Sequence, residues 1–126
     1  MKTIILLLIV AVSFLAGALS IAGTESDKAK EAFDTYGCSG CHVSGKDWNG
    51  PDLTDVTENR SKEWIIDFIL NTKKHYDDPV IKDMIEVFNL HMPDQGVEPK
   101  DAELIYEYLK SLAKPAETKE EKKENK

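Results

Sequence analysis

The feature that most constrains the fold of this chain is the segment 38–42, in which two cysteines are separated by two residues and a histidine follows the second cysteine. This spacing is the attachment signature of a c-type haem. Each thiol adds to one vinyl group of the haem, and a single helical turn can span the two vinyls. The histidine is then held under the iron as an axial ligand. We therefore predict that Cys38 and Cys41 attach a haem and that His42 is its proximal ligand.

Three other uses of a Cys-x-x-Cys pair fit the sequence less well. A thioredoxin-like redox pair requires a βαβ context, and the chain shows no alternation of strands and helices. A zinc site would need two further ligands at suitable spacing, yet only His75 and His91 remain and neither lies in a Cys/His cluster. A disulfide between Cys38 and Cys41 would close a very short loop and would stabilise little. Haem attachment is therefore the interpretation that we retain.

The N-terminal segment indicates export. Residues 4–19 are almost wholly apolar, Lys2 is the one charged residue before Glu25, and small residues follow the apolar run. This pattern is typical of a cleaved signal peptide, so we assign residues 1–22 to it and expect a periplasmic protein without membrane contact after cleavage. The alternative is an uncleaved transmembrane anchor, because the apolar run is near the lower length limit for a spanning helix.

The remaining chain divides into one domain, residues 23–114, and a tail, residues 115–126, which is rich in Lys and Glu and is expected to be disordered. The chain holds 23 acidic and 16 basic residues, so its formal net charge is −7. An acidic chain is a poor candidate for nucleic-acid binding. It suits electrostatically steered docking on a basic protein surface, although the charge is equally compatible with a role in solubility alone.

Hydrophobic periodicity predicts an all-α domain. Apolar residues recur with helical spacing in four stretches that begin at capping residues or at proline, and we expect the apolar face of each helix to be buried in the core. The predicted helices span residues 24–36, 61–72, 78–90 and 98–112. The glycine-rich residues 43–55 and the charged residues 73–77 are expected to be loops. Because four helices give a thin core, a covalently held macrocycle would supply much of the buried apolar surface.

The remaining axial position of the iron has several candidate ligands. Met84 falls on the apolar face of a predicted helix, where a methionine is usually core packing, and His75 lies in a charged loop where it would face solvent. Met92 follows a helix that would place it over the haem, and Pro93 stiffens its loop. We therefore predict Met92 as the distal ligand, with His91 as its rival and an open iron site as a further alternative. Thioether ligation raises the reduction potential relative to a second imidazole.

Three further residues are candidates for contact with the haem or its ligand. A ligating histidine needs a partner for its second ring nitrogen, and the carbonyl of Pro51 lies in a rigid Gly-Pro turn that suits this role. The indole N–H of Trp64 and the guanidinium of Arg60 are suitable donors to a haem propionate. Trp64 also follows helical spacing, so a place in the core is the other interpretation for it.

With these segments in order, the sequence resembles a monohaem class I cytochrome c of the bacterial periplasm over about residues 26–112. The resemblance rests on the Cys-x-x-Cys-His segment, Gly50-Pro51-Asp52-Leu53, the region around Trp64, Met92-Pro93-Asp94 and Tyr106-Glu107-Tyr108-Leu109. It implies a small cytochrome c fold in which the first and last helices cross, with one covalently attached haem c. It also implies His42 as proximal ligand, the Pro51 carbonyl as its hydrogen-bond partner, and Met92 as distal ligand.

The leading functional hypothesis is a soluble one-electron carrier that is not an enzyme. A six-coordinate iron leaves no site for substrate, and the chain offers no other group for acid–base or nucleophilic catalysis. Its partners would be a redox donor and a redox acceptor protein, met through small interfaces, and we expect a monomer. Two alternatives stay open: a gas-binding or sensor haem with a weak or absent bond from Met92, and a haem subunit of a larger enzyme that is attached through the charged tail.

Overall fold

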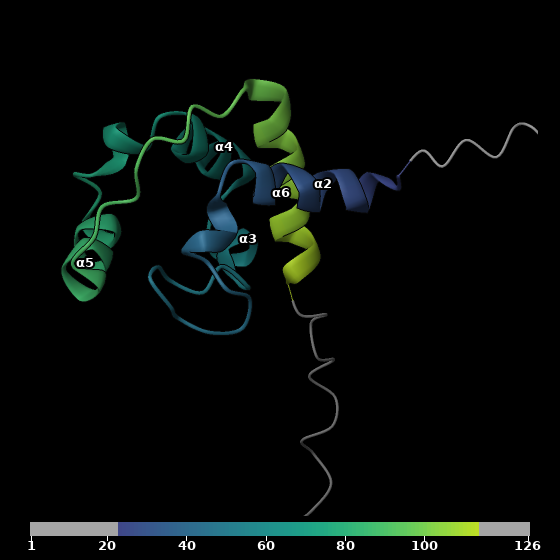
Figure 1. Ribbon diagram of the computed structural model, residues 1–126. Coiled ribbons are helices and arrows are strands. Elements are labelled where there is room, and N and C mark those ends of the chain that lie inside the picture. Colours follow the sequence, from purple (N-terminus) through teal and green to yellow (C-terminus); the bar gives the residue numbers. More distant parts are fainter. Residues whose placement is uncertain (1–22, 114–126) are drawn as a thin grey trace, which may run out of the picture.

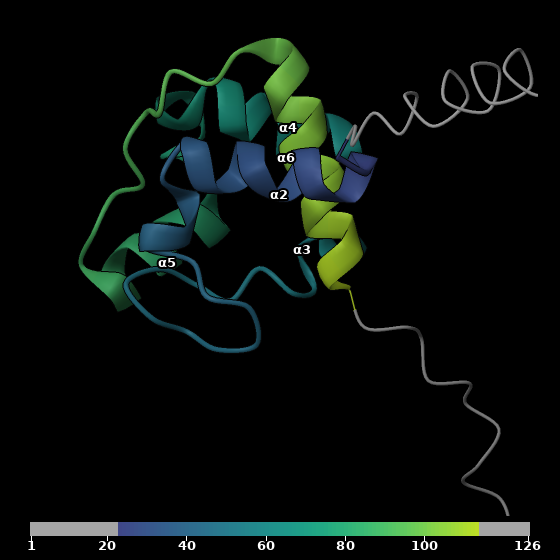
Figure 2. The same cartoon turned by 45° about the vertical axis from the view of Figure 1, so that its right-hand side comes forward.

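The computed structural model describes residues 23–113, and it contains no β-strand within them (Figures 1 and 2). Five α-helices and two 3₁₀ turns follow one another in this part of the chain. They are α2 (Glu25–Thr35), η1 (Cys38–Gly40), α3 (Val56–Asn59), α4 (Lys62–Leu70), η2 (Thr72–His75), α5 (Pro79–Phe88) and α6 (Pro99–Leu112). The prediction of an all-α fold is confirmed. The segments assigned to a signal peptide and a charged tail, 1–22 and 115–126, lie outside the described residues.

Capping residues start the helices where the sequence predicts. At α2, the Asp27 N–H donates to Thr24 Oγ1 at 3.2 Å, and the Thr24 N–H donates to Asp27 Oδ2 at 3.0 Å, which completes a capping box. Ser61 Oγ accepts from the third residue of α4 at 3.2 Å. Asp78 caps α5, whose first residue is Pro79. These side chains satisfy N–H groups that have no partner within their helix. None of the described helices is long and apolar enough to cross a membrane.

The core is built on the crossing of α2 and α6, which both views show (Figures 1 and 2). Phe33 is 4% exposed and packs its ring against Tyr108, with the two ring centroids 4.8 Å apart. Small and aliphatic side chains fill the rest of the contact, and α4 adds Ile65 and Ile69 to it. The buried residues contributed by α2 and α6 are Ala29, Ala32, Phe33, Ala102, Ile105 and Leu109. We refer to α2, α4 and α6 together as the helix cluster.

A polar contact fixes the end of α2 against the start of α6. The Tyr36 hydroxyl donates to Asp101 Oδ2 at 2.7 Å and accepts from the Glu98 backbone N–H at 3.4 Å. Tyr36 directly follows α2, and Gly37 comes next with a φ of 74°, in the left-handed region that glycine adopts without steric cost. The chain therefore leaves the helix cluster at a fixed point and turns at once into the segment 38–42.

Helix α5 differs from the prediction of a helix buried in the core. None of its residues is buried, and it packs extensively against no other described element. Val80 is 46% exposed and Val87 is 74% exposed. The apolar side chains on its inner side line a cavity that is also lined by residues of the helix cluster. The helical period correctly predicted an apolar face, but the described chain supplies no packed protein surface for that face to cover.

The prediction of a solvent-exposed His75 is wrong. The turn η2 folds back on α4, so the His75 side chain is only 12% exposed and packs its ring on Trp64 and Phe68, with centroid distances of 5.2 and 5.5 Å. Asp67 on α4 holds the turn in place: its Oδ2 lies 2.7 Å from Lys74 Nζ and 2.8 Å from His75 Nε2. The hydrogen bond from Lys74 is the largest of the effects that lower the pKa of Asp67 to about 2. The carboxylate therefore stays ionised, and keeps its partners, into strongly acidic solution.

One helix boundary and one short helix also differ from the prediction. Helix α4 ends at Leu70 rather than near Thr72, because Asn71 leaves the helical region with a φ of −136° while its side-chain N–H₂ donates to Asp67 Oδ1 at 2.9 Å. The short helix α3 was not predicted at all. Its four residues are too few for a hydrophobic period to appear.

Removing the aromatic ring of Phe33 tests whether the α2–α6 crossing stabilises the whole domain. Replacing a buried phenylalanine by alanine costs about 3–5 kcal/mol, so Phe33→Ala should lower the free energy of unfolding of the protein by about that amount in guanidinium denaturation. Trp48→Ala is the control, because Trp48 is 59% exposed and exposed positions usually contribute less than about 1 kcal/mol. Equal losses in the two variants would contradict this description of the core.

Candidate haem site

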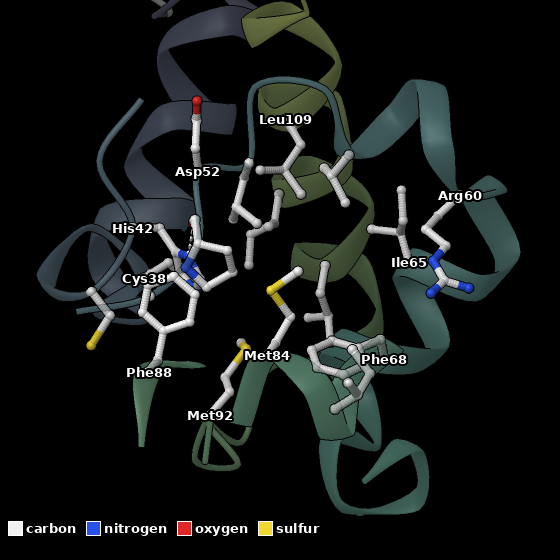
Figure 3. A pocket seen from close by; sticks show the side chains of 18 of the residues that line it. Cys38, His42, Asp52, Arg60, Ile65, Phe68, Met84, Phe88, Met92 and Leu109 are labelled. Atoms are coloured by element: carbon white, nitrogen blue, oxygen red, sulfur yellow. Dashed lines mark hydrogen bonds between the residues drawn. The ribbon is translucent and has the colours of Figure 1, made fainter. Parts of the chain in front are cut away.

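A cavity of about 560 Å³ lies between α5 and the helix cluster. Its volume falls within the range of about 300–1,000 Å³ that is usual for ligand and cofactor pockets. Apolar side chains form most of its wall. Ile65 and Leu109 reach it from the helix cluster, whereas Met84 and Phe88 reach it from α5 (Figure 3). A flat apolar group placed here would complete the core that the helices leave open.

The two cysteines and His42 lie together on the wall of this cavity. The turn η1 begins at Cys38, and the backbone N–H groups of Cys41 and His42 both donate to the Cys38 carbonyl, at 3.1 and 3.0 Å. Both thiols are free. Burial raises the pKa of the Cys38 thiol above its usual value. The single turn expected from the sequence is therefore present, and it presents all three side chains to one space.

The structure places Pro51 beside His42, as the sequence predicts. His42 Nδ1 lies 2.8 Å from the Pro51 carbonyl oxygen (Figure 3). Because a carbonyl only accepts, Nδ1 carries the hydrogen and Nε2 keeps its lone pair. Burial lowers the pKa of His42, and the hydrogen bond to Pro51 opposes this effect only in part. The ring is therefore neutral at neutral pH and is chemically suited to ligate a metal.

Gly50 has a role beyond the turn that the sequence indicates. It is buried, and its N–H donates to the Cys41 carbonyl at 3.0 Å. A Cβ at this position would lie 2.8 Å from His42 Cε1 and 3.1 Å from His42 Nδ1. The backbone thus approaches the imidazole so closely that only glycine leaves room for it. The sequence does carry a signal for this contact, because Gly50 directly precedes Pro51, whose carbonyl accepts from His42.

Asp52 orders the loop that holds His42, a role the sequence did not reveal. Its Oδ1 accepts from the Gly45 N–H at 2.9 Å and from the Thr54 N–H and hydroxyl at 3.0 and 2.6 Å. Its own N–H donates to Asp47 Oδ1 at 2.8 Å. Residues 43–55 contain no helix, and these bonds from side chain to backbone take the place of one.

Of the candidates for the second axial position, Met92 and Met84 line the cavity, whereas His91 and His75 do not. Figure 3 shows the side chains of Met84 and Met92 extending into the same space. Met92 is half-buried; His91 is exposed and rests its ring against Tyr76, with the ring centroids 4.9 Å apart. Met84 is 38% exposed, so the expectation that it packs in a protein core is wrong.

Arg60 and Trp64 stand together at the wall of the cavity. The Arg60 guanidinium lies 4.3 Å from the centre of the Trp64 ring, which is a cation–π contact. Arg60 Nη2 also lies 3.6 Å from Asp78 Oδ1, at the cap of α5. Trp64 in turn stacks on Phe68 at 5.2 Å. The sequence predicted the two residues as neighbours of the cofactor, and the structure brings both to the cavity.

Comparison with known proteins agrees with this geometry. The family model described as Cytochrome c matches residues 26–113. Similar solved structures include cytochrome c from Rhodothermus marinus, with a TM-score of 0.66 and 29% identity, covering 75% of this chain and 81% of that one. An engineered form, Rma TDE, has a TM-score of 0.65 and 28% identity, covering 76% and 84%. The same engineered form bound to a carbene intermediate gives 0.62 and 28%, covering 76% and 83%. Among curated proteins, the sequence comparison finds no match.

The chain belongs to the cytochrome c family. It therefore carries a covalently bound haem c and is a haem-based electron carrier. The residues present fit this cofactor, because two free thiols, a neutral imidazole and an apolar cavity of suitable size occur together in one place. The resemblance stated from the sequence is confirmed at the level of family and fold.

Gly50→Ala tests the close contact between the loop and His42. The added methyl group overlaps the imidazole, and overpacking of this kind typically costs about 1–3 kcal/mol. We expect that loss in the free energy of unfolding of the haem-containing protein, measured by denaturant titration. Gly40→Ala is the matched control within the attachment segment, since a Cβ there meets no atom within 4 Å. If the two variants have the same free energy of unfolding, the loop can move away from the ring and the close contact is not rigid.

Proposed function

We propose that this protein is a soluble one-electron carrier of the periplasm whose single haem c is ligated by His42 and Met92. The observation that carries the proposal is that these two side chains, from segments far apart in sequence, line one apolar cavity. When bound, the haem supplies an iron that cycles between two oxidation states one electron apart. The periplasmic location is proposed from residues 1–22 of the sequence alone.

The two side chains have complementary roles in this proposal. His42 offers Nε2 as a neutral donor because its Nδ1–H is bound to the Pro51 carbonyl. Met92 offers a thioether, which favours the reduced iron more than an imidazole does and so raises the reduction potential. With protein side chains on both faces, the iron offers no position to a substrate. We therefore place the protein among electron carriers rather than enzymes.

Three observations favour Met92 over the other candidates. It lines the cavity, which His91 does not. Its carbonyl oxygen accepts a hydrogen bond from the Tyr76 hydroxyl at 2.7 Å, so its backbone is held by the protein. Met84, by contrast, stands on α5, which has no extensive packing partner in the described chain. Met92 is thus the thioether whose position the polypeptide itself determines.

Arg60 and Trp64 are proposed to bind the carboxylates of the cofactor. The guanidinium has five N–H donors, and its contact with Asp78 at 3.6 Å is longer than a well-formed charge-assisted hydrogen bond. Donor capacity therefore remains for a further anion. The stacking of Trp64 between Arg60 and Phe68 keeps both donors at the wall of the cavity.

Two methionine variants test the distal ligand. A ferric haem with a sulfur–iron bond shows a weak far-red absorption band, so Met92→Ala should abolish this band. Met84→Leu is the matched control, a volume-conserving change of the other thioether that lines the cavity, and it should leave the band unchanged. A high-spin ferric parent that binds carbon monoxide readily would instead favour the sensor alternative. Loss of the band in Met84→Leu, with retention in Met92→Ala, would reverse the assignment.

We place the docking surface for a basic redox protein along the exposed rim of the cavity at α5, and we expect the carrier to act as a monomer. Val80 and Leu90 line the cavity and are nevertheless 46% and 48% exposed, and Val87 on α5 is 74% exposed, which is an unusual gathering of apolar side chains on a small surface. Asp83 and Glu86 are exposed on the same helix. Acidic side chains beside an apolar patch suit a partner with a basic rim, and the net charge of −7 would steer its approach.

Small redox probes of opposite charge test the electrostatic part of this proposal. Because salt screens the attraction, the rate of electron transfer with the cation hexaammineruthenium should fall as ionic strength rises, and the rate with ferricyanide should rise. The double variant Asp83→Asn/Glu86→Gln should weaken the salt dependence for the cation. The control Glu25→Gln/Glu31→Gln removes the same charge from α2 and should change it less. Equal salt dependence in both double variants would place the docking surface elsewhere.

A further inference from the structure

One side chain contacts both residues that compete for the distal position. Tyr76 lies between η2 and α5, and its hydroxyl donates to the Met92 carbonyl oxygen at 2.7 Å. Its ring meets that of His91 edge-on, with a centroid distance of 4.9 Å and an interplanar angle of 65°. Tyr76 also lines the cavity. It is therefore in contact with the backbone of one candidate ligand and with the side chain of the other.

The two candidates face different surroundings because they are neighbours in a non-helical segment. Residues 90–98 have no helical structure, and His91 is exposed whereas Met92 is half-buried and lines the cavity. The two side chains therefore point to different sides of the segment. Bringing His91 to the cavity would therefore require this part of the backbone to turn over. Such a turn would break the hydrogen bond at the Met92 carbonyl and the ring contact at His91 together.

We infer that Tyr76 is a positioning residue that presents Met92, rather than His91, to the haem iron. Its hydroxyl holds the Met92 backbone, and its ring retains the His91 imidazole on the outer side of the segment. The inference rests on the proposed ligation by Met92. It adds the reason why a chain with a histidine directly before the methionine is ligated through sulfur, although imidazole is also a good haem ligand.

The two contacts can be removed one at a time. Tyr76→Phe deletes the hydroxyl and keeps the ring, whereas Tyr76→Leu deletes both. A hydrogen bond of this kind corresponds to a change of about two- to twelvefold in an equilibrium. Imidazole added to ferric Tyr76→Phe should therefore displace the sulfur ligand at a concentration lower by about that factor, while the far-red band before addition is retained. Tyr106→Phe is the control, because Tyr106 lies on α6 and does not line the cavity.

The larger variant shows which ligand takes over. In Tyr76→Leu we expect the far-red band to weaken, the reduction potential to fall, and the electron paramagnetic resonance signal of two imidazole ligands to appear. Adding His91→Gln to Tyr76→Leu should remove that signal. A destabilised but otherwise correctly ligated protein would show none of these spectral changes. If Tyr76→Leu does not fold, the imidazole titration of Tyr76→Phe decides alone.

Each result separates this inference from the proposal on which it rests. If Met92→Ala keeps the far-red band in the otherwise unchanged protein, the ligation by Met92 fails. If Met92→Ala loses the band but Tyr76→Phe binds imidazole with the same affinity as the parent and Tyr106→Phe, Met92 remains the ligand and the role of Tyr76 is overturned. The signal of two imidazoles in Tyr76→Leu, abolished by His91→Gln, supports the inference in full.

Discussion

The packing of α2 across α6 is the contact on which the rest of this structure depends. The Phe33–Tyr108 pair and the small residues beside it hold the crossing together, and the bonds from Tyr36 tie the end of α2 to the start of α6. Gly37 then turns the chain, so Cys38, Cys41 and His42 leave the crossing at a defined place. Gly50 and Pro51 close on the imidazole from the other side. The side of the site that holds His42, the proximal wall, is therefore built by contacts within the polypeptide.

The distal wall is built on a different physical basis. The inner side chains of α5 face a cavity, none of its residues is buried, and its connections to the rest of the domain are the short capping and loop contacts at its ends. In a cytochrome c, the haem completes this apolar interior, so the cofactor stabilises the arrangement of α5 as any ligand stabilises the state that binds it. One group thus serves both the packing and the chemistry. This explains how so small a chain sustains an apolar site of this size.

Local signals were sufficient for the helix starts and for the proximal side of the site. Thr24, Ser61 and Asp78 are N-cap residues that mark the starts of their helices. The Cys-x-x-Cys-His segment and Gly50-Pro51 are close in sequence, and together they predict the hydrogen bond between His42 and Pro51. The errors concern residues whose surroundings come from other elements of the fold. The sequence around His75 is charged, yet Asp67, Trp64 and Phe68 enclose it; Met84 has a core-like pattern, yet it borders a cavity. The contacts of Tyr76 with His91 and Met92 join residues at least fifteen positions apart, and no local pattern could have indicated them.

The outward-facing surface of α5 has a consequence for how such a protein can diverge. Side chains on the outer surface of this helix contribute little to the helix cluster, because they contact solvent rather than other described helices. Substitutions at these positions therefore cost little stability. The residues there can change to complement the surface of a binding partner. The crossing of α2 and α6 can stay constant while α5 changes its charge and shape. Related proteins with this fold can therefore change their binding partners while the helix core stays the same.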